Sequence, residues 1–227
     1  MIRLPRLSHE RLSARIQNGK ILERDHSVKT GFDLKVVLAE DGMVYKFFRV
    51  RRFFSSNLIS PYARRFAGNA RRLNAARIPA PDVREVFYVS ALQRQVAVYP
   101  WIEGRTLVDF LSREESPKAR RGVFFALGKF MAGLHENGIL FHAGHLNNYV
   151  RTPDGGLALI DVTDVQFRRG PLDRKLRLKN IRKLARKPVD HELLNQYGWE
   201  ALLEGYQANS LGTAALTVRE IRAVASG

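Results

Sequence analysis

Residues 134–161 have the sequence LHENGILFHAGHLNNYVRTPDGGLALID, and this stretch decides the fold. It begins at the end of residues 118–137, where apolar side chains recur at the spacing of an amphipathic helix. Gly138 follows at a position where a glycine commonly ends a helix. After it comes a loop, residues 141–148, that is rich in His and Asn. The first half of the stretch therefore predicts a long helix followed by a polar loop.

The second half of the stretch predicts a small hairpin. A short strand at 149–150 is followed by the turn sequence Pro-Asp-Gly-Gly at 153–156 and by an apolar strand at 157–160. Asp161 ends the second strand. The pattern therefore places Asn148 and Asp161 at the two ends of one hairpin.

Upstream, the first third of the chain is typical of strands. Apolar runs at 35–39 and 43–48 are separated by Glu-Asp-Gly at 40–42, which predicts a hairpin. A helix is predicted over 60–76, with Ser-Pro at its start. It ends before Ile-Pro-Ala-Pro at 78–81, because a residue that precedes proline disfavours helix.

Two more strands are predicted at 85–89 and 95–99, and Pro-Trp-Ile-Glu-Gly then breaks the pattern. A short helix is predicted at 106–111, and the chain beyond residue 161 is predicted to be helical and largely basic. Because strands come first and helices follow, the pattern favours an α+β fold over an alternating parallel sheet.

The same order predicts the domain organisation. Residues 1–99 are expected to form a strand-rich lobe with one helix, and residues 100–104 a hinge. Residues 105–227 are expected to form a helical lobe that contains the small hairpin.

The composition limits the class of protein. The chain has 227 residues, of which 45% are hydrophobic, which is enough to bury a core. It contains no cysteine, which excludes disulfides and thiolate metal sites and is typical of a reducing cytoplasm. Residues 1–20 lack the apolar core of a secretory signal, and no apolar run is long enough to cross a membrane. We therefore expect a cytoplasmic protein.

The charge predicts anionic partners. The formal net charge is +16, a surface that favours nucleic acid, anionic lipid or phosphorylated glycan. Residues 44–81 contain no Asp or Glu, and residues 168–187 contain ten Lys and Arg against Asp173 alone. Both blocks also carry apolar residues, so they are expected to be basic faces of folded elements. The block at 168–187 is the first candidate for peripheral contact with an anionic membrane.

The ordered set of motifs resembles the protein kinase fold, and more closely the bacterial lipopolysaccharide-core kinase family, which phosphorylates heptose or Kdo sugars. The resemblance is carried by Val44-Tyr45-Lys46, Asn69 to Leu73 with Ile78 to Pro81, Tyr99 to Gly104, Leu134 to Ile139, and Leu159 to Asp161. The loop Phe141 to Asn148 and the segment Leu159 to Arg169 are most similar to small bacterial kinase-like proteins of the "toluene tolerance" family.

The resemblance implies an ATP site with Mg²⁺. In such a site Lys46 holds the ATP phosphates, Lys29 approaches them from the covering loop, and the hinge contacts the nucleotide through Glu103. Asn148 and Asp161 would hold Mg²⁺, which prefers oxygen ligands, and Asp161 would also count as catalytic. Taken alone, these residues have plainer interpretations: a solvated strand lysine, a loop asparagine bonded to its own backbone, and a turn-forming aspartate.

Three parts of the usual kinase site are missing. Ala143 stands where the catalytic Asp is expected and Phe141 where the preceding His is expected. The acid-free stretch 44–81 offers no helix-borne Glu for the strand lysine, although Asn69 could bond to it. The phosphate-covering loop at 26–31 carries a single glycine.

His145 is the candidate replacement for the missing base. It lies three residues before Asn148 and coincides with the His of the similar loop. Only His145 and His142 titrate near neutral pH in this region. His145 could act as the catalytic base or as a structural histidine bonded to backbone, and we expect it to matter more than His142.

Three functions follow from the sequence. The first is an ATP-dependent kinase of a lipopolysaccharide-core sugar or related envelope glycan, with a non-standard catalytic loop. The second is a pseudokinase that binds nucleotide or partner proteins without turnover. The third is a basic nucleic-acid-binding domain. The third is disfavoured because the sequence has no helix-turn-helix pattern, zinc spacing or aromatic RNA-binding motif.

Overall fold

The computed structural model describes residues 4–28, 31–50, 61–114, 116–210, 216, 219–220 and 223. The chain divides into two compact units, Met1–Ile102 and Glu103–Gly227. Strands dominate the first unit and helices the second. The division falls inside the expected hinge at 100–104, and the lobe boundaries stay a prediction.

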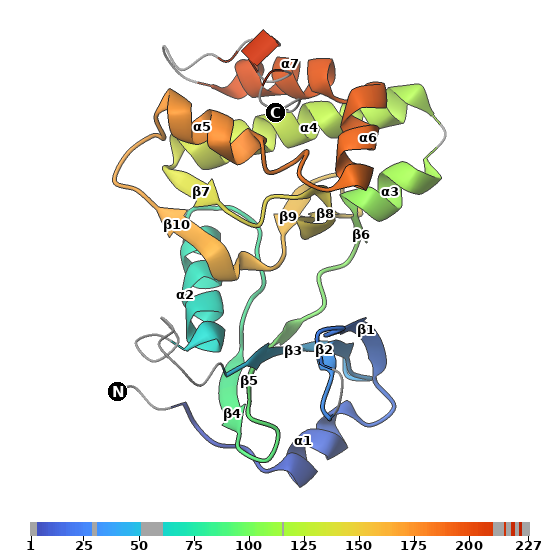
Figure 1. Ribbon diagram of the computed structural model, residues 1–227, viewed down its shortest axis with the longest axis vertical. Coiled ribbons are helices and arrows are strands. Elements are labelled where there is room, and N and C mark those ends of the chain that lie inside the picture. Colours follow the sequence, from blue (N-terminus) through green and yellow to red (C-terminus); the bar gives the residue numbers. More distant parts are fainter. Residues whose placement is uncertain are drawn as a thin grey trace. The chain divides into compact units, whose positions relative to one another are not determined.

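The first unit is built on a five-stranded antiparallel sheet with the strand order β1-β2-β3-β5-β4 (Figure 1). Its elements are α1 (His9–Ile16), β1 (Lys20–Arg24), β2 (Leu34–Leu38), β3 (Met43–Arg49), α2 (Tyr62–Ala75), β4 (Glu85–Val89) and β5 (Arg94–Pro100). The hairpin β2–β3, the helix α2 and the strands β4 and β5 match the elements expected from the sequence. The elements α1 and β1 were not predicted.

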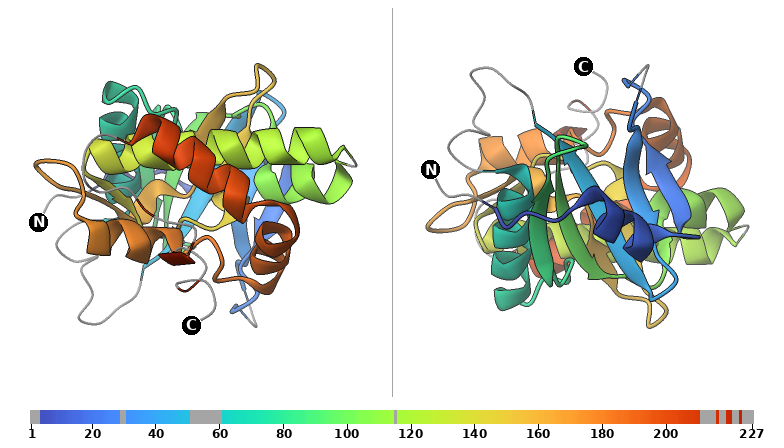
Figure 2. Two further views of the ribbon diagram at one scale, coloured as in Figure 1. Left: turned by 90° about the horizontal axis from the view of Figure 1, so that it is seen from above. Right: turned by 90° about the horizontal axis from the view of Figure 1, so that it is seen from below.

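A helix covers each face of this sheet. Alternate residues of the central strands, such as Phe47, form one apolar cluster with Leu12 of α1, which lies across the sheet in Figure 2. Residues of opposite parity face α2. The Phe66 ring on α2 lies 5.7 Å from the Phe48 ring and 5.6 Å from the Tyr99 ring, measured between centroids. The side of β3 that α2 covers is therefore the side that carries Lys46.

The second unit contains two small sheets and five α-helices within its described residues, with strand orders β6-β8-β9 and β10-β7. Its elements are β6 (Arg105–Thr106), α3 (Leu107–Arg113), α4 (Pro117–Glu136), β7 (Ile139–Phe141), η1 (Leu146–Asn148), β8 (Tyr149–Arg151), β9 (Leu157–Leu159), η2 (Val162–Asp164), β10 (Val165–Phe167), α5 (Arg174–Ile181), α6 (Pro188–Tyr197) and α7 (Trp199–Asn209). The expected hairpin is β8–β9. The short strands β6, β7 and β10 were not predicted, because no sequence period marks them. The expectation that the chain beyond residue 161 is helical was wrong at β10.

The long helix α4 packs against α7, and the two lie side by side in Figures 1 and 2. Ser116 caps α4 by accepting a hydrogen bond from the Ala119 amide, as a helix N-cap does. The crossing is made close by two glycines. A Cβ on Gly128 would overlap the backbone of Leu202, and a Cβ on Gly205 would overlap the backbone of α4.

In the part of the chain that the structure describes, no helix has both the length and the apolar character needed to cross a bilayer.

Candidate functional site

Lys46 lies in the middle of the central strand, paired with Val36 on β2 and Ala97 on β5. It is only 5% exposed. Its Nζ lies 5.8 Å from the ring centroid of Phe48 and 5.8 Å from that of Phe66. An ammonium at this distance is attracted by the face of an aromatic ring. The interpretation of Lys46 as a solvated strand lysine is therefore wrong.

Helix α2 supplies no carboxylate to this lysine, as its sequence predicted. It presents Phe66 and, three residues later on the same face, the buried Asn69. A ring face attracts a cation by about 0.5–2 kcal/mol but carries no net charge. The positive charge of Lys46 is thus held beside α2 without being neutralised by it.

The polar loop between β7 and β8 is joined to the segment that carries Asp161. The His142 amide donates to the Asp164 carbonyl at 3.0 Å, and the Ile160 amide donates to the Asn148 carbonyl at 2.9 Å. These two backbone bonds place Asn148 next to the end of β9. The sequence expectation that Asn148 and Asp161 flank one hairpin is therefore met.

The side-chain amide of Asn148 has a fixed orientation. Its Nδ2 donates to the Ala143 carbonyl at 2.7 Å and to His145 Nε2 at 3.1 Å. Both amide hydrogens are therefore engaged, while Oδ1 makes no hydrogen bond with a described residue. The plainer interpretation, an asparagine bonded to its own loop, holds. The same bonds leave a carbonyl oxygen of the kind that Mg²⁺ prefers.

Ala143 and His145 contribute to the loop by orienting Asn148. Ala143 offers its carbonyl oxygen and has no side chain that accepts a proton. The Nε2 of His145 accepts the hydrogen bond from Asn148, so in the neutral ring the proton is on Nδ1. A nitrogen engaged in this way is not free to take a proton from a substrate. The contact favours the structural role of His145 over the role of base.

Asp161 is half-buried and adopts a left-handed backbone conformation, with φ 55° and ψ 47°. Asp tolerates this region better than most residues, which agrees with its interpretation as a turn former. Unusual backbone angles also concentrate at functional sites. The turn ends β9 and starts η2, and it fixes where the Asp161 side chain leaves the chain.

Two buried polar residues hold the loop from the helical side. Asn180 of α5 brackets Phe141: its Nδ2 donates to the Phe141 carbonyl at 2.6 Å, and its Oδ1 accepts from the Phe141 amide at 3.4 Å. Asp190 of α6 accepts from the Leu146 amide at 3.1 Å. Asp190 is 1% exposed, and burial raises the pKa of its carboxyl although the Leu146 amide and Lys187 oppose the rise. The loop is therefore fixed at both ends.

A series of side-chain hydrogen bonds connects Arg177 to Asn180, the residue that holds Phe141. Arg177 Nη1 donates to the Tyr206 hydroxyl at 3.2 Å, and His135 contacts Tyr206 at 2.7 Å and Asn180 Oδ1 at 3.0 Å. Because Asn180 Oδ1 only accepts, His135 Nε2 donates to it. Burial lowers the pKa of His135 to about 4, so the ring is neutral and its Nδ1 accepts from Tyr206. Arg177 therefore donates to Tyr206, Tyr206 to His135, His135 to Asn180, and Asn180 to the Phe141 carbonyl.

The first donor of this series, Arg177, is held by a buried ion pair. Its Nη1 lies 2.7 Å from Glu136 Oε1, and the two side chains are 1% and 14% exposed. Arg177 also donates to the Leu172 carbonyl at 2.6 Å and to the Ser210 hydroxyl at 3.2 Å. This buried ion pair and its hydrogen bonds hold α4, α5 and α7 together. Removing either partner would leave the other charge buried and unpaired, which is strongly destabilising.

The remaining expected site residues are less defined. Lys29 lies outside the described residues. Glu103 is exposed, and its contact with nucleotide stays a prediction. Within the described residues, no three or more His, Asp or Glu side chains are grouped to hold a metal ion. The expected Mg²⁺ site differs from such a group, since it uses one carboxylate and one amide together with phosphate oxygens.

Sequence reasoning missed the supporting residues His135, Arg177, Asn180 and Asp190. Asn180 and Asp190 lie some 40 residues from the backbone groups that they bond, and no local period links them. Arg177 was counted as one cation of a basic block, but it is buried. One sequence signal does exist: Asn180 lies three positions after Arg177, so both share the inward face of α5 with Ile181.

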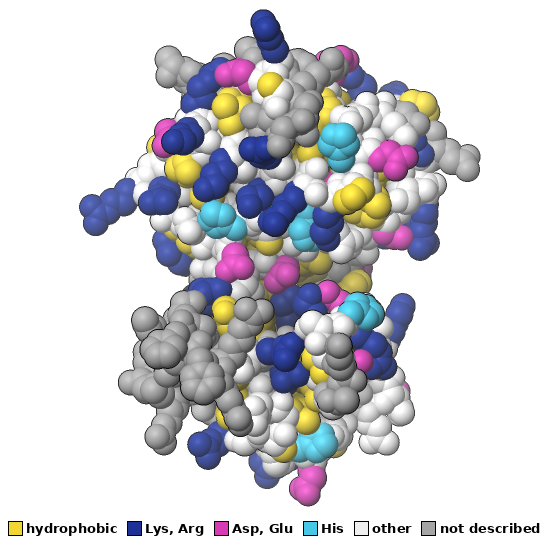
Figure 3. All heavy atoms as spheres, in the orientation of Figure 1, with side chains coloured by type: hydrophobic (Ala, Val, Ile, Leu, Met, Phe, Trp, Pro, Cys, Tyr) yellow, Lys and Arg dark blue, Asp and Glu magenta, His cyan; other side chains and the backbone are white. Residues whose placement is uncertain are grey.

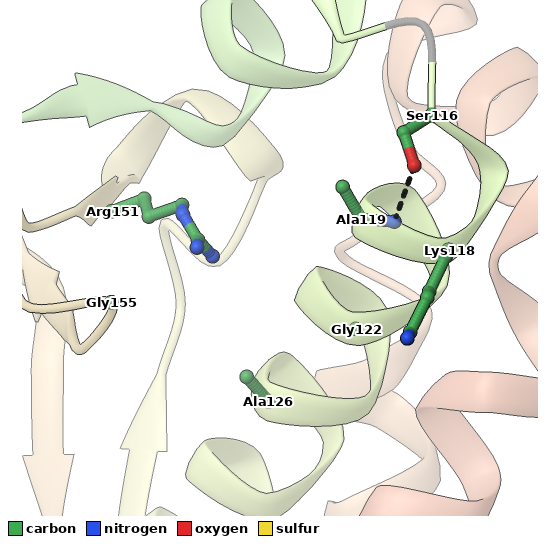
Figure 4. Close-up of a pocket in the computed structure, with 7 residues that line it drawn as sticks. All are labelled: Ser116, Lys118, Ala119, Gly122, Ala126, Arg151 and Gly155. Carbon is green, nitrogen blue, oxygen red and sulfur yellow. Dashed lines mark hydrogen bonds between the residues drawn. The ribbon is translucent and has the colours of Figure 1, made fainter.

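A groove of about 460 Å³ lies elsewhere in the second unit, between the start of α4 and the β8–β9 turn (Figure 4). Figure 4 shows Arg151 reaching toward the α4 surface that Ala119, Gly122 and Ala126 form. None of the expected site residues lines this groove. It is therefore separate from the polar loop.

No protein-family model matches the chain, and no curated protein sequence matches it. Solved structures do resemble it. One is the bifunctional kinase-methyltransferase WbdD, with a TM-score of 0.50 and 17% identity over 84% of this chain and 46% of that chain. Another is WbdD co-crystallised with the kinase inhibitor LY294002, with a TM-score of 0.51 and 18% identity over 84% of this chain and 42% of that chain.

The chain thus spans less than half the length of these structures. At such identities the likeness establishes the fold alone. The fold is a kinase-like α+β fold with a strand-rich first part and a helical second part, as the sequence predicted.

Proposed function

We propose that this chain is an ATP- and Mg²⁺-dependent phosphotransferase. The observation that carries the proposal is the fixed amide of Asn148: its side-chain oxygen makes no hydrogen bond with a described residue, and its backbone carbonyl is bonded to Ile160, the neighbour of Asp161. A neutral oxygen and a carboxylate at one turn are donors that Mg²⁺ accepts. The buried Lys46, on the central strand of a kinase-like fold, supplies the cation that such a site needs for the phosphates.

In this proposal each residue neutralises or orients charge. Asn148 and Asp161 hold Mg²⁺, which when bound neutralises charge on the transferred phosphate. Lys46 binds phosphate oxygens, and its two ring neighbours limit where its ammonium can go. Ala143 provides no proton acceptor, so the loop contributes by positioning. Phosphoryl transfer tolerates this better than acyl transfer, because its transition state is loose and asks mainly for alignment and charge stabilisation.

The acceptor in this proposal is an anionic glycan, of which a lipopolysaccharide-core sugar is the example that the sequence resemblance favours. The net charge of +16 supports an anionic acceptor and a peripheral contact with an anionic membrane. A second function, a pseudokinase that binds nucleotide without turnover, is favoured by one observation: Ala143 offers only a carbonyl at the position of the usual base.

The test is the affinity of the chain for ATP with and without Mg²⁺, measured by isothermal calorimetry. We expect Mg²⁺-dependent binding that Asp161→Asn abolishes. Asp154→Asn, the same change at an exposed carboxylate of the β8–β9 turn, should leave it intact. Equal affinity in Asp161→Asn and parent would contradict the metal assignment. Binding without phosphate transfer to a purified lipopolysaccharide core would favour the pseudokinase.

A further inference from the structure

The segment that joins α5 to α6 runs alongside the polar loop. Just before the segment, Asn180 bonds both backbone groups of Phe141, and just after it Asp190 bonds the Leu146 amide. Phe141 and Leu146 are the two ends of the loop residues 142–145. The chain between Asn180 and Asp190 is therefore held against the same loop at both of its ends.

The segment folds as a compact turn that points its cations outward. The amides of Lys183 and Leu184 donate to the carbonyls of Asn180 and Ile181 at 3.0 and 2.9 Å. Ile181 and Leu184 are fully buried. The charged residues between and after them are turned to the surface: Arg182, Arg186 and Lys187 are exposed and Lys183 is half-buried. Packing of the apolar residues therefore fixes the direction of the cations.

Of these four cations, only Lys187 interacts electrostatically with a described acid, the buried Asp190. None of them makes an ion pair shorter than 4 Å with a described carboxylate. Elsewhere on α5, Arg174 is paired with Glu220 and Arg177 is buried with Glu136. Figure 3 shows Lys and Arg side chains gathered on the face of the second unit over α5 and the chain that follows. The segment that joins α5 to α6 thus presents a cluster of cations beside the loop.

We propose that Arg182, Lys183, Arg186 and Lys187 form a binding site for phosphate groups that the acceptor, a phosphorylated saccharide, already carries. Two guanidinium groups and two ammonium groups within six residues match clustered phosphate oxygens. Such a compact turn is short for the row of phosphates along a nucleic-acid duplex, which favours the saccharide. The assignment rests on the proposed function for its place in catalysis, whereas the phosphate binding itself needs no ATP.

The site explains how a loop without a catalytic carboxylate can still select its substrate. A phosphate bound at residues 182–187 would hold the saccharide next to the loop that presents Asn148. Orientation of this kind lowers the barrier for transfer without any acid or base. The residues of the segment are positioning and specificity residues in this proposal, and they take no part in bond making.

The experiment compares two matched double variants in the full chain. Lys183→Gln/Lys187→Gln changes the proposed site, and Lys118→Gln/Lys129→Gln makes the same change on the exposed side of α4. The probe is the deacylated lipopolysaccharide-core oligosaccharide, used with its phosphates and after their chemical removal, at one near-physiological ionic strength. We expect parent and control to bind the phosphorylated probe alike and Lys183→Gln/Lys187→Gln to bind it about tenfold or more weakly. The dephosphorylated probe should bind weakly to all three.

If both double variants lost affinity for the phosphorylated probe equally, the proposal would be overturned, because the binding would depend on the overall positive charge and not on a site at residues 182–187. Equal binding of the two probes would overturn it as well. So would tighter binding to duplex DNA, or to vesicles of neutral and anionic phospholipid, than to the phosphorylated probe. If Lys183→Gln/Lys187→Gln does not fold, Arg182→Gln/Arg186→Gln must show the same loss. Intact Mg²⁺-ATP binding in the variant separates failure here from failure of the proposed function.

Discussion

In the polar loop between β7 and β8, the side chain of His145 orients the side-chain amide of Asn148. Its Nε2 accepts one hydrogen of the Asn148 amide, and the Ala143 carbonyl accepts the other. Without the imidazole, the amide keeps one partner and can rotate, which would turn a nitrogen toward the place of its oxygen. The residue at position 145 therefore determines whether the side-chain oxygen of Asn148 keeps the orientation in which it could bind Mg²⁺.

We predict that His145→Ala weakens Mg²⁺-dependent ATP binding and destabilises the fold by roughly 1–3 kcal/mol, because a buried donor is left unpaired. His145→Gln should recover part of both losses, since its amide oxygen can accept from Asn148. Calorimetry and denaturant unfolding measure the two quantities. His142→Ala is the control and should change ATP affinity less. A His145→Ala protein that loses turnover at unchanged stability and affinity would instead identify His145 as the base.

At the scale of elements, the crossing of α4 and α7 depends on residues without side chains. Gly128 faces the backbone of Leu202 and Tyr206, and Gly205 faces the backbone of Phe125. Backbone atoms cannot rotate away as a flexible side chain can. The same helix pair carries His135 and Tyr206, so the closeness of the crossing also sets the hydrogen bond between them.

We predict that Gly128→Ala destabilises the protein by about 1–3 kcal/mol, because the added methyl group forces α4 and α7 apart. Gly122→Ala on the same helix is the matched control: nothing lies within 4 Å of its Cβ position. It should stabilise the protein by about 0.5–1 kcal/mol through better helix propensity. Thermal and denaturant unfolding decide the matter. Two variants of equal stability would show that the helices can separate at no cost.

Sequence reasoning recovered the elements that have a period and missed those that do not. Helix α4 and the strands β2 to β5 have regular apolar spacing or clear turns, and their positions were predicted. Strands β7 and β10 have three residues each, too few to show a period. Helix α1 buries only Leu12, so its apolar face is barely visible in the sequence.

The candidate site was recovered to a similar extent. Lys46, Asn148 and Asp161 were named because they lie at element ends or on a strand in a familiar order. The partners that orient the loop come from α5 and α6 and are set by tertiary packing. The expected convergence of Lys46 with Asn148 and Asp161 stays a prediction, and so do the roles of Glu103 and Lys29.

For the whole molecule, the buried His135 links stability to acidity. Burial lowers its pKa from the usual 6.5 to about 4 in the folded state. As the pH falls through this window, the unfolded chain takes up a proton that the folded chain refuses, so folding loses free energy. The stability is fully present above pH 6.5 and declines toward pH 4. Asp190 acts in the opposite sense, because its pKa is raised in the folded state.

We predict that the free energy of unfolding falls by roughly 3 kcal/mol between pH 6.5 and pH 4 on account of His135, beyond the effect of general charge repulsion. His135→Gln removes the titrating ring and should flatten this part of the pH profile, even if it lowers stability at pH 7. His191→Gln, at a half-buried site on α6, should keep the slope. Parallel profiles for parent and His135→Gln would contradict the assignment.

The five-stranded sheet of the first unit has two edges, and each is protected against joining another sheet. At β1 three of the four exposed positions carry a charge, Lys20, Glu23 and Arg24, and the fourth is Ile21; the pairing with β2 is irregular on both sides of Glu23. Charge and irregular pairing both discourage a second sheet from adding to an edge.

At β4 the protection is part of the same chain. The Tyr88 amide donates to the Pro5 carbonyl at 2.8 Å, and the Leu7 amide donates to the Tyr88 carbonyl at 3.1 Å. Residues 5–7 therefore occupy both backbone hydrogen-bonding groups of Tyr88, on an edge that has fewer charges of its own. A chain trimmed before α1 would keep its core strands and expose this edge, and its first defect would be self-association in place of unfolding.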